Sequence, residues 1–337
     1  MPDGIGSPFM LEELSALDVL AGLSSFTVAV NDPPWSTLAP LAPAPRRIVA
    51  AWDMDIGVLE AAIDADDEAD VIVGIGGGTA LDTAKFLAWT SGKRLIQIPT
   101  ITSVDAGFTT AIGIRDGGSV RYIGDITPEL VVLDLALIRS APPHLNRAGI
   151  GDILSCHTGL HDWRSASDGG HGHPWRSDLA QLAATLLAEL DQAADEINAV
   201  SDDGVRFMAS AYRRIGAACA QAGHSRFEEG SEHFWAYCYE HATGAHQVHG
   251  ELIALGVVAL SHAQSNDPQW ARSVVQRCGT RANPEALGIS RDQFVDALVS
   301  LRTYARSKSL DISVADLRDI TPAVAQAAWE FVQDLPT

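Results

Sequence analysis

The chain has 337 residues, of which 47% are hydrophobic and 20% charged, a composition typical of a folded globular protein. Its 43 acidic and 23 basic residues give a net charge of -20 without any Lys/Arg run, so nucleic acid and anionic membranes are poor partners. No apolar stretch approaches the length of a membrane span, and no basic leader precedes an apolar stretch. The four cysteines lack a CxxC spacing, so we expect a reduced, cytoplasmic protein.

Up to about residue 140, short apolar runs rich in β-branched residues alternate with helical patterns. We expect strands at residues 26–30, 46–52, 71–75, 94–100 and 129–134. Between the second and third of these runs, residues 55–70 have the period of an amphipathic helix. Such alternation favours a parallel sheet with helices on both faces.

After Pro142 and Pro143 the pattern changes to long helical segments, among them residues 177–200 and 245–264. No comparable β-branched run recurs, so the second half is predicted to be all-helical. We therefore expect an α/β, Rossmann-like dinucleotide-binding domain over residues 1–143 and an all-helical domain over residues 144–337.

The segment VIVGIGGGTALDTAK places three glycines between a predicted strand and a predicted helix: Gly76, Gly77 and Gly78. Such a turn lets backbone N–H groups approach a diphosphate, although a tight turn without a ligand would also need glycine. Asp82 and Lys85 follow three residues apart, on one face of the helix.

Hydroxyl and carboxylate side chains gather where the next strand ends, in PTITSVDAGFTT. They are Thr100, Ser103, Asp105 and Thr109. Because open parallel sheets bind ligands at the carboxyl ends of their strands, these residues and the glycine turn indicate a nucleotide crevice. Asp32, at the end of the first predicted strand, stands where an acid accepts from the adenosine ribose, which favours NAD over NADP.

Several motifs, in order, are similar to those of the glycerol and iron-type alcohol dehydrogenase superfamily. They are GGGTALDTAK, PTITSVDAG, AGIGDILSCHTGLHDW, SRFEEGSEH and HGE. The last two resemble the sn-glycerol-1-phosphate dehydrogenase branch most. The resemblance, which runs from about Val71 to Leu255, implies a two-domain architecture of the dehydroquinate synthase type.

The resemblance also implies one divalent metal held by Asp152, His233 and His249. One carboxylate and two imidazoles suit zinc or iron and leave a position open for a substrate oxygen; we favour zinc. The family further implies that Asp82 and Lys85 hold NAD or NADP with the glycine turn. Its pattern assigns the phosphates or the nicotinamide end to Thr100, Ser103 and Thr109, and substrate contacts to Asp105 and Asp152.

Three features depart from the branch. Tyr237 stands where the branch has a substrate-contacting histidine, and Glu228 and Glu229 fall within the stretch that is neutral there. Carboxylates facing the site would repel a phosphate, by roughly 1 kcal/mol for each unit pair at 4 Å in water, whereas carboxylates pointing outward would not. The N-terminal half is also short, which predicts that the family's opening strand and hairpin are trimmed.

We therefore expect a metal-dependent, NAD(P)-linked dehydrogenase that forms a homo-oligomer and acts on a small polyol or ketone. Dihydroxyacetone phosphate and sn-glycerol 1-phosphate are the favoured pair. Three alternatives stay open: a dehydrogenase for a non-phosphorylated polyol, a sugar-phosphate cyclase of the dehydroquinate synthase type, and a non-enzymatic ligand-binding relative. Among the other histidines, His157 and His161 lie four residues apart, which would place them on one helix face; one has no role in the family, and core or rim positions stay open for both.

Overall fold

The computed structural model describes residues 9–116 and 119–337. The chain forms two compact units, the first comprising residues 1–146 and 208–221 and the second residues 147–207 and 222–337. None of the helices in the described part combines the length and hydrophobicity needed to cross a bilayer.

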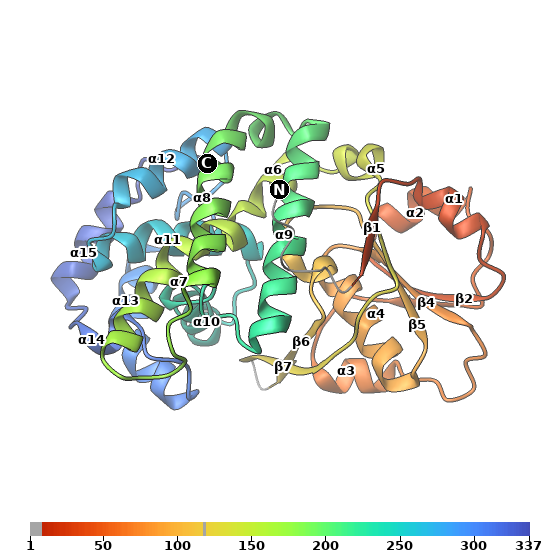
Figure 1. Ribbon diagram of the computed structural model, residues 1–337, viewed down its shortest axis with the longest axis horizontal. Helices are drawn as coiled ribbons and strands as arrows, with labels where there is room; N and C mark the ends of the chain where they lie inside the picture. The colour runs from red at the N-terminus through yellow and green to blue at the C-terminus, as the bar shows by residue number, and fades with distance from the viewer. Residues whose placement is uncertain (1–8, 117–118) are drawn as a thin grey trace. The chain divides into compact units, whose positions relative to one another are not determined.

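The first unit is built on a six-stranded parallel sheet with the strand order β1-β8-β5-β4-β2-β3. Figure 1 labels β1, β2, β4 and β5 of this sheet. Its strands are β1 (Met10–Glu12), β2 (Phe26–Val30), β3 (Arg47–Ala50), β4 (Val71–Gly76), β5 (Arg94–Pro99) and β8 (Leu130–Val132). The five predicted strands are thus confirmed. The opening strand was expected to be trimmed; it is present as the three-residue β1, which pairs with β8 at the edge of the sheet.

Helices cover both faces of this sheet. They are α1 (Ala16–Ala21), α2 (Pro34–Leu38), α3 (Ile56–Ala61), α4 (Gly78–Ser91) and α5 (Leu135–Ser140). Alternate residues of β4 point to opposite faces: Val73 packs in one core with α1 and α2, and Ile72 in the other with α3 and α4. The predicted fold, a parallel sheet covered on both faces, is confirmed.

The helix predicted over residues 55–70 is much shorter, because α3 ends at Ala61. Aspartates beyond it bond to nearby backbone instead: Asp64 accepts from Asp66 N at 3.0 Å, and Asp67 from Ala69 N at 2.9 Å. Such local bonds compete with a helix. An antiparallel pair, β6 (Ala111–Asp116) and β7 (Ser119–Asp125), follows the short helix η1 (Asp105–Phe108) and was not predicted.

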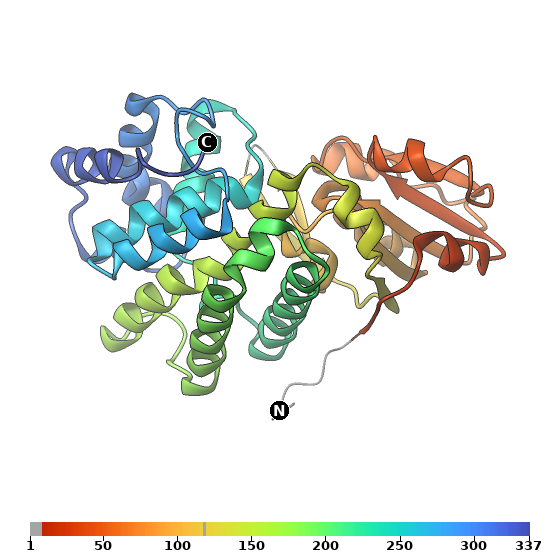
Figure 2. The same cartoon turned by 90° about the horizontal axis from the view of Figure 1, so that it is seen from above.

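The second unit contains helices and no strand among its residues, all of which the structure describes (Figures 1 and 2). Its helices are α7 (Ile150–Asp168), α8 (Ser177–Ala199), α10 (Ser231–Thr243), α11 (His249–Gln264), α12 (Pro268–Cys278), α13 (Arg291–Ser307), α14 (Val314–Leu317) and α15 (Pro322–Phe331). The short α6 (Pro143–Ala148) and the long α9 (Asp202–Ala222) each have residues in both units.

The all-helical character predicted for this half is confirmed. The helix predicted over residues 245–264 begins later in the structure. α10 ends at Thr243, with Gly244 as its left-handed C-cap, and α11 begins only at His249.

Candidate functional site

The glycine turn joins the end of β4 to the start of α4. A Cβ on Gly76 would lie 2.6 Å from Asn31 Oδ1, and this residue has a φ of 150°, which disfavours other side chains. A Cβ on Gly77 would lie 2.9 Å from Ile101 Cδ1, and one on Gly78 2.9 Å from Val104 Cγ1. A side chain at Gly76 would therefore be strained, and one at Gly77 or Gly78 would displace Ile101 or Val104; the turn itself carries no side chains.

Asn31, at the end of β2, ties this turn to the neighbouring strand. Its Oδ1 accepts from Gly77 N at 3.2 Å, and its Nδ2 donates to the carbonyl of Ala51 beyond β3. Asp32 is exposed, and its carboxylate accepts from Ser36 N at 3.0 Å. The structure thus places an amide, not an acid, against the turn, with the predicted ribose acceptor Asp32 next along the chain.

At the end of β5, Thr100 N donates to Gly76 O at 3.0 Å, which joins this strand end to the turn. The side chain of Thr100 is buried, and its Oγ1 has no hydrogen-bond partner among the described residues. Ser103 is also buried, whereas Asp105, the first residue of η1, is half-buried. A bare glycine turn beside an unsatisfied buried hydroxyl fits a bound diphosphate, which supplies acceptor oxygens.

Asp82 and Lys85 form a buried ion pair, with Lys85 Nζ 3.0 Å from Asp82 Oδ1. Nζ also donates to Ala111 O at 2.7 Å and to Thr109 Oγ1 at 3.2 Å. Burial raises the pKa of Asp82, against the opposing effect of the Lys85 charge. The lysine therefore anchors α4 to the start of β6, and its direct contact with a dinucleotide remains a prediction.

In the second unit, Asp152 of α7, His233 of α10 and His249 of α11 converge. One ligand atom from each lies within 4.8 Å of the other two, and His249 Nε2 is 3.4 Å from Asp152 Oδ1. Asp152 and His233 are buried and His249 is half-buried. Three helices thus bring together the donor set proposed from the sequence, at separations that one divalent cation can bridge.

Glu232 holds the His233 imidazole in place. Its side chain is fully buried, and its Oε1 accepts from His233 Nδ1 at 2.9 Å and from Gly230 N at 2.7 Å. Because a carboxylate only accepts, Nδ1 carries a proton, so the proton that a metal would displace is the one on Nε2. Sequence reasoning missed this residue, although a glutamate beside a candidate histidine ligand in SEH was a visible signal.

Tyr237 and Glu229 lie next to His233. The Tyr237 and His233 rings are 6.1 Å apart between centroids, and the Tyr237 hydroxyl donates to Glu229 Oε1 at 2.9 Å. Ser225 Oγ donates to the other carboxylate oxygen at 2.7 Å.

The charge of this glutamate reaches the metal ligand. Burial alone would lower the pKa of His233, but the bond to Glu232 and the charges of Glu232, Glu229 and Asp152 raise it to about 10. The charge of Glu229 therefore acts on His233, one residue of the triad. By contrast, the charge of Glu228, together with burial, raises the pKa of Cys156 on α7.

Asp162 on α7 is a further residue that the sequence did not single out. Its buried carboxylate accepts from Ser231 N and from Val314 N, both at 2.7 Å, and so holds the starts of α10 and α14. Burial is the main cause that raises its pKa to about 6. This carboxylate fixes the first turn of α10, two residues before His233.

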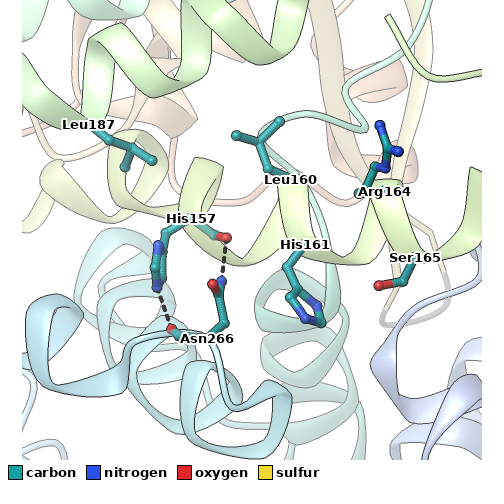
Figure 3. A pocket seen from close by; sticks show the side chains of 7 residues that line it. All are labelled: His157, Leu160, His161, Arg164, Ser165, Leu187 and Asn266. Carbon is teal, nitrogen blue, oxygen red and sulfur yellow. Dashed lines mark hydrogen bonds between the residues drawn. The ribbon is translucent and has the colours of Figure 1, made fainter. Parts of the chain in front are cut away.

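A separate hollow of 420 Å³ lies on α7 beside His157, His161 and Arg164 (Figure 3). His157 Nε2 donates to Asn266 O at 2.7 Å, and Asn266 Nδ2 donates back to the carbonyl of His157 at 2.9 Å. His157 and His161 follow Asp152 by five and nine residues, which turns them away from the metal-ligand face of α7. His157 is thus a bonding partner of the segment after α11.

Comparison with known proteins finds relatives in sequence and in fold. A family model described as iron-containing alcohol dehydrogenase matches residues 44–142. The glycerol-1-phosphate dehydrogenase [NAD(P)+] of Hyperthermus butylicus is 33% identical over 233 residues, 68% of this chain and 65% of the relative. The enzyme of the same name from Methanospirillum hungatei is 28% identical over 85% of this chain and 79% of its own.

A solved structure extends the likeness to the whole fold. It is that of a probable glycerol dehydrogenase from Sinorhizobium meliloti, and it superposes with a TM-score of 0.72 over 97% of this chain and 96% of the other, at 21% identity. The predicted resemblance is therefore confirmed: the chain has the fold of the glycerol and iron-type alcohol dehydrogenases, and glycerol-1-phosphate dehydrogenases are among its relatives in sequence.

Proposed function

We propose that this chain is a metal-dependent, NAD(P)-linked dehydrogenase that interconverts a small ketone and the corresponding polyol. The observation that carries the proposal is the convergence of Asp152, His233 and His249 within 4.8 Å of one another. Residues 1–143 would bind the dinucleotide, and residues 144–337 the metal and the substrate. The named relatives act as NAD(P)-linked dehydrogenases, which supports the same assignment.

For the cofactor, the glycine turn would hold the diphosphate through its bare backbone, with Thr100 Oγ1 as an added donor. Ser103 and Thr109 would bind further along the dinucleotide. NAD is the proposed form, because the exposed carboxylate of Asp32 follows Asn31 at the turn and would repel a 2′-phosphate.

For the metal, Asp152 and the two imidazoles would be the ligands, and zinc is the proposed ion because it accepts such a mixed N/O set. When bound, the metal would polarise the ketone oxygen, and the dinucleotide would supply the hydride. Glu232 keeps His233 in the tautomer and orientation that ligation requires. Asp105 and Tyr237 would hydrogen-bond the substrate hydroxyls, and Asp152 would also approach the reacting one.

Reduction of dihydroxyacetone phosphate to sn-glycerol 1-phosphate is the proposed reaction, in line with the names of the relatives. Transfer of a hydride from NADH and of a proton from solvent to the carbonyl completes it. A second candidate is a non-phosphorylated polyol or hydroxyketone. The contact between Tyr237 and Glu229 beside His233 favours this candidate, since it sets a carboxylate, not a cation, near the triad.

A substrate panel tests these assignments. Protein loaded with zinc or iron would be assayed at 340 nm with NADH or NADPH, against dihydroxyacetone phosphate and dihydroxyacetone. Oxidation of NADH with the phosphorylated ketone alone supports the first reaction, and oxidation with the uncharged ketone alone supports the second. Absence of net NADH consumption with either ketone would contradict a dehydrogenase, and product formation from a sugar phosphate without it would indicate a cyclase. Sedimentation of the same sample tests the proposed homo-oligomer.

A further inference from the structure

We propose that Trp52 is the platform on which the adenine ring of the dinucleotide stacks, an inference that rests on the nucleotide binding proposed above. Trp52 is 73% exposed, more than Tyr122 at 60% or Trp89 at 43%, the other exposed aromatic residues of the first unit. Its indole makes no ring contact and no hydrogen bond with any described residue. An exposed indole of this kind presents a whole apolar face to a ligand.

The position of Trp52 relates it to the glycine turn. It follows β3 at the carboxyl edge of the sheet, directly after Ala51, whose N–H donates to Val30 O at 2.9 Å. The Ala51 carbonyl accepts from Asn31, and Asn31 in turn accepts from Gly77 N. A continuous series of hydrogen bonds therefore fixes the backbone beside Trp52 relative to the turn.

The strand order gives the spacing. β4, which carries the turn, pairs with β2, and β2 pairs with β3, so the two strand ends are separated by two strand spacings, about 10 Å. In a dinucleotide bound at the end of a parallel sheet, the diphosphate lies at the glycine turn and the adenosine extends across the neighbouring strand ends. A ribose joins the phosphate to the base over this gap, which brings the base to the end of β3.

The local charge suits an adenosine without an added phosphate. Asp53 follows Trp52 in the chain, and its carboxylate is held in place because Oδ1 accepts from Asp55 N at 3.0 Å. With Asp32 at the end of β2, the strand ends carry acids that can accept from ribose hydroxyls. The indole can stack on the neutral, flat purine of such an adenosine, because stacking needs no charge.

Calorimetric titration of metal-loaded wild type and Trp52→Ala with three ligands tests the proposal. NAD⁺ and ADP-ribose contain adenine, and nicotinamide mononucleotide does not. We expect Trp52→Ala to bind NAD⁺ and ADP-ribose roughly 5- to 100-fold more weakly, the loss of one base stack, and nicotinamide mononucleotide unchanged. Trp52→Phe should recover part of the lost affinity, since a smaller ring still stacks.

Trp89→Ala is the matched control, because Trp89 is an exposed indole of the same unit, near the far end of α4 and about 16 Å along the helix from Gly78. It should leave all three affinities unchanged. Thermal melting would establish that both variants fold.

Failure of the proposed function and failure of the adenine platform would give different results. Wild type that binds neither NAD⁺ nor ADP-ribose would overturn the proposed function itself. Wild-type binding with equal affinity in Trp52→Ala would overturn only the adenine platform. A Trp52→Ala variant that sediments differently from wild type but binds nucleotides equally well would also overturn the adenine platform. That result would assign Trp52 and the exposed Ile48 of β3 to contact with a second copy.

Discussion

Glu232 accepts a hydrogen bond from Nδ1 of His233 at 2.9 Å, in a position where the glutamate side chain is fully buried. Two consecutive residues of one helix thus form a carboxylate–imidazole pair, with the opposite ring nitrogen left for a metal. Such partners fix ring orientation and raise the basicity of the ligand.

Glu232→Gln should therefore weaken metal binding roughly 10- to 100-fold while the protein stays folded, because glutamine keeps the acceptor oxygen but loses the charge. Zinc affinity from competition with a chelator measures this without an activity assay. Glu240→Gln is the control: it changes a buried glutamate of the same helix, about 12 Å further along. Equal zinc affinity in wild type and Glu232→Gln would show that the pair does not support ligation.

Metal binding should also depend on pH. In the metal-free protein the pKa of His233 is raised to about 10, above its ordinary 6.5, so the imidazole carries a proton at neutral pH. Zinc must displace that proton, and its apparent affinity should rise about tenfold per pH unit below pH 10. Calorimetry at pH 7.5 in buffers of different ionisation enthalpy should report about one proton released per zinc from this residue.

The same shift affects the stability of the metal-free fold. A pKa raised in the folded state stabilises it fully below the unfolded value of 6.5, and this contribution is lost as the pH rises through about 10. Denaturant unfolding of chelator-treated protein should therefore show falling stability over that interval. Constant stability across it, or no proton release on binding, would contradict the protonated state of His233.

Glu229 should discriminate against phosphorylated substrates. Glu229→Gln removes the charge beside His233 while keeping an acceptor for Tyr237, so kcat/KM for dihydroxyacetone phosphate should rise relative to that for dihydroxyacetone. About fivefold is expected from roughly 1 kcal/mol between unit charges at 4 Å in water. Glu228→Gln is the control, because the Glu228 charge acts on Cys156 of α7. An unchanged ratio in Glu229→Gln would place the substrate away from this carboxylate.

Lys85 should contribute to the stability of the fold through its buried ion pair with Asp82. Lys85→Met leaves the buried Asp82 without its cation and should cost about 3–5 kcal/mol of unfolding free energy. The double variant Asp82→Asn/Lys85→Met should recover part of that loss, since the unpaired charge is gone. Arg46→Met, which breaks the exposed pair with Glu68, should cost no more than about 1 kcal/mol. If Lys85→Met were as stable as wild type, the lysine would be free to serve a ligand.

The parts that sequence patterns predict well are those with a strong local signal. The β-branched runs of β2, β4 and β5 and the long amphipathic pattern of α8 are reproduced closely. Burial on both faces leaves a continuous apolar run in the strands, and burial on one face leaves a clear period in the helix. The end of α3 and the hairpin β6–β7 escaped prediction. In the first, aspartate side chains compete for backbone groups, and in the second, strand pairing depends on distant neighbours.

For the site, the motifs supplied the residues of the metal triad, and the structure brings their ligand atoms together. Burial could not be foreseen: the motif assigns Lys85 to the dinucleotide, and the structure encloses its ammonium group among Asp82, Thr109 and Ala111. The direction of Glu229 could not be predicted either, because hydrogen bonds from Ser225 and Tyr237 fix where its carboxylate points.

The first unit includes residues 208–221, and Tyr212 there donates its hydroxyl to Thr102 O at 2.8 Å, three residues before Asp105. On the ribosome, all six strands of the sheet are synthesised by residue 132, yet this contact must wait for about 80 further residues. The six strands are therefore complete before the Thr102 carbonyl can accept from Tyr212, although Thr102 N can already donate to Asn146 Oδ1. Chain elongation itself delays this contact between residues 102 and 212 until the middle of the helical half has been made.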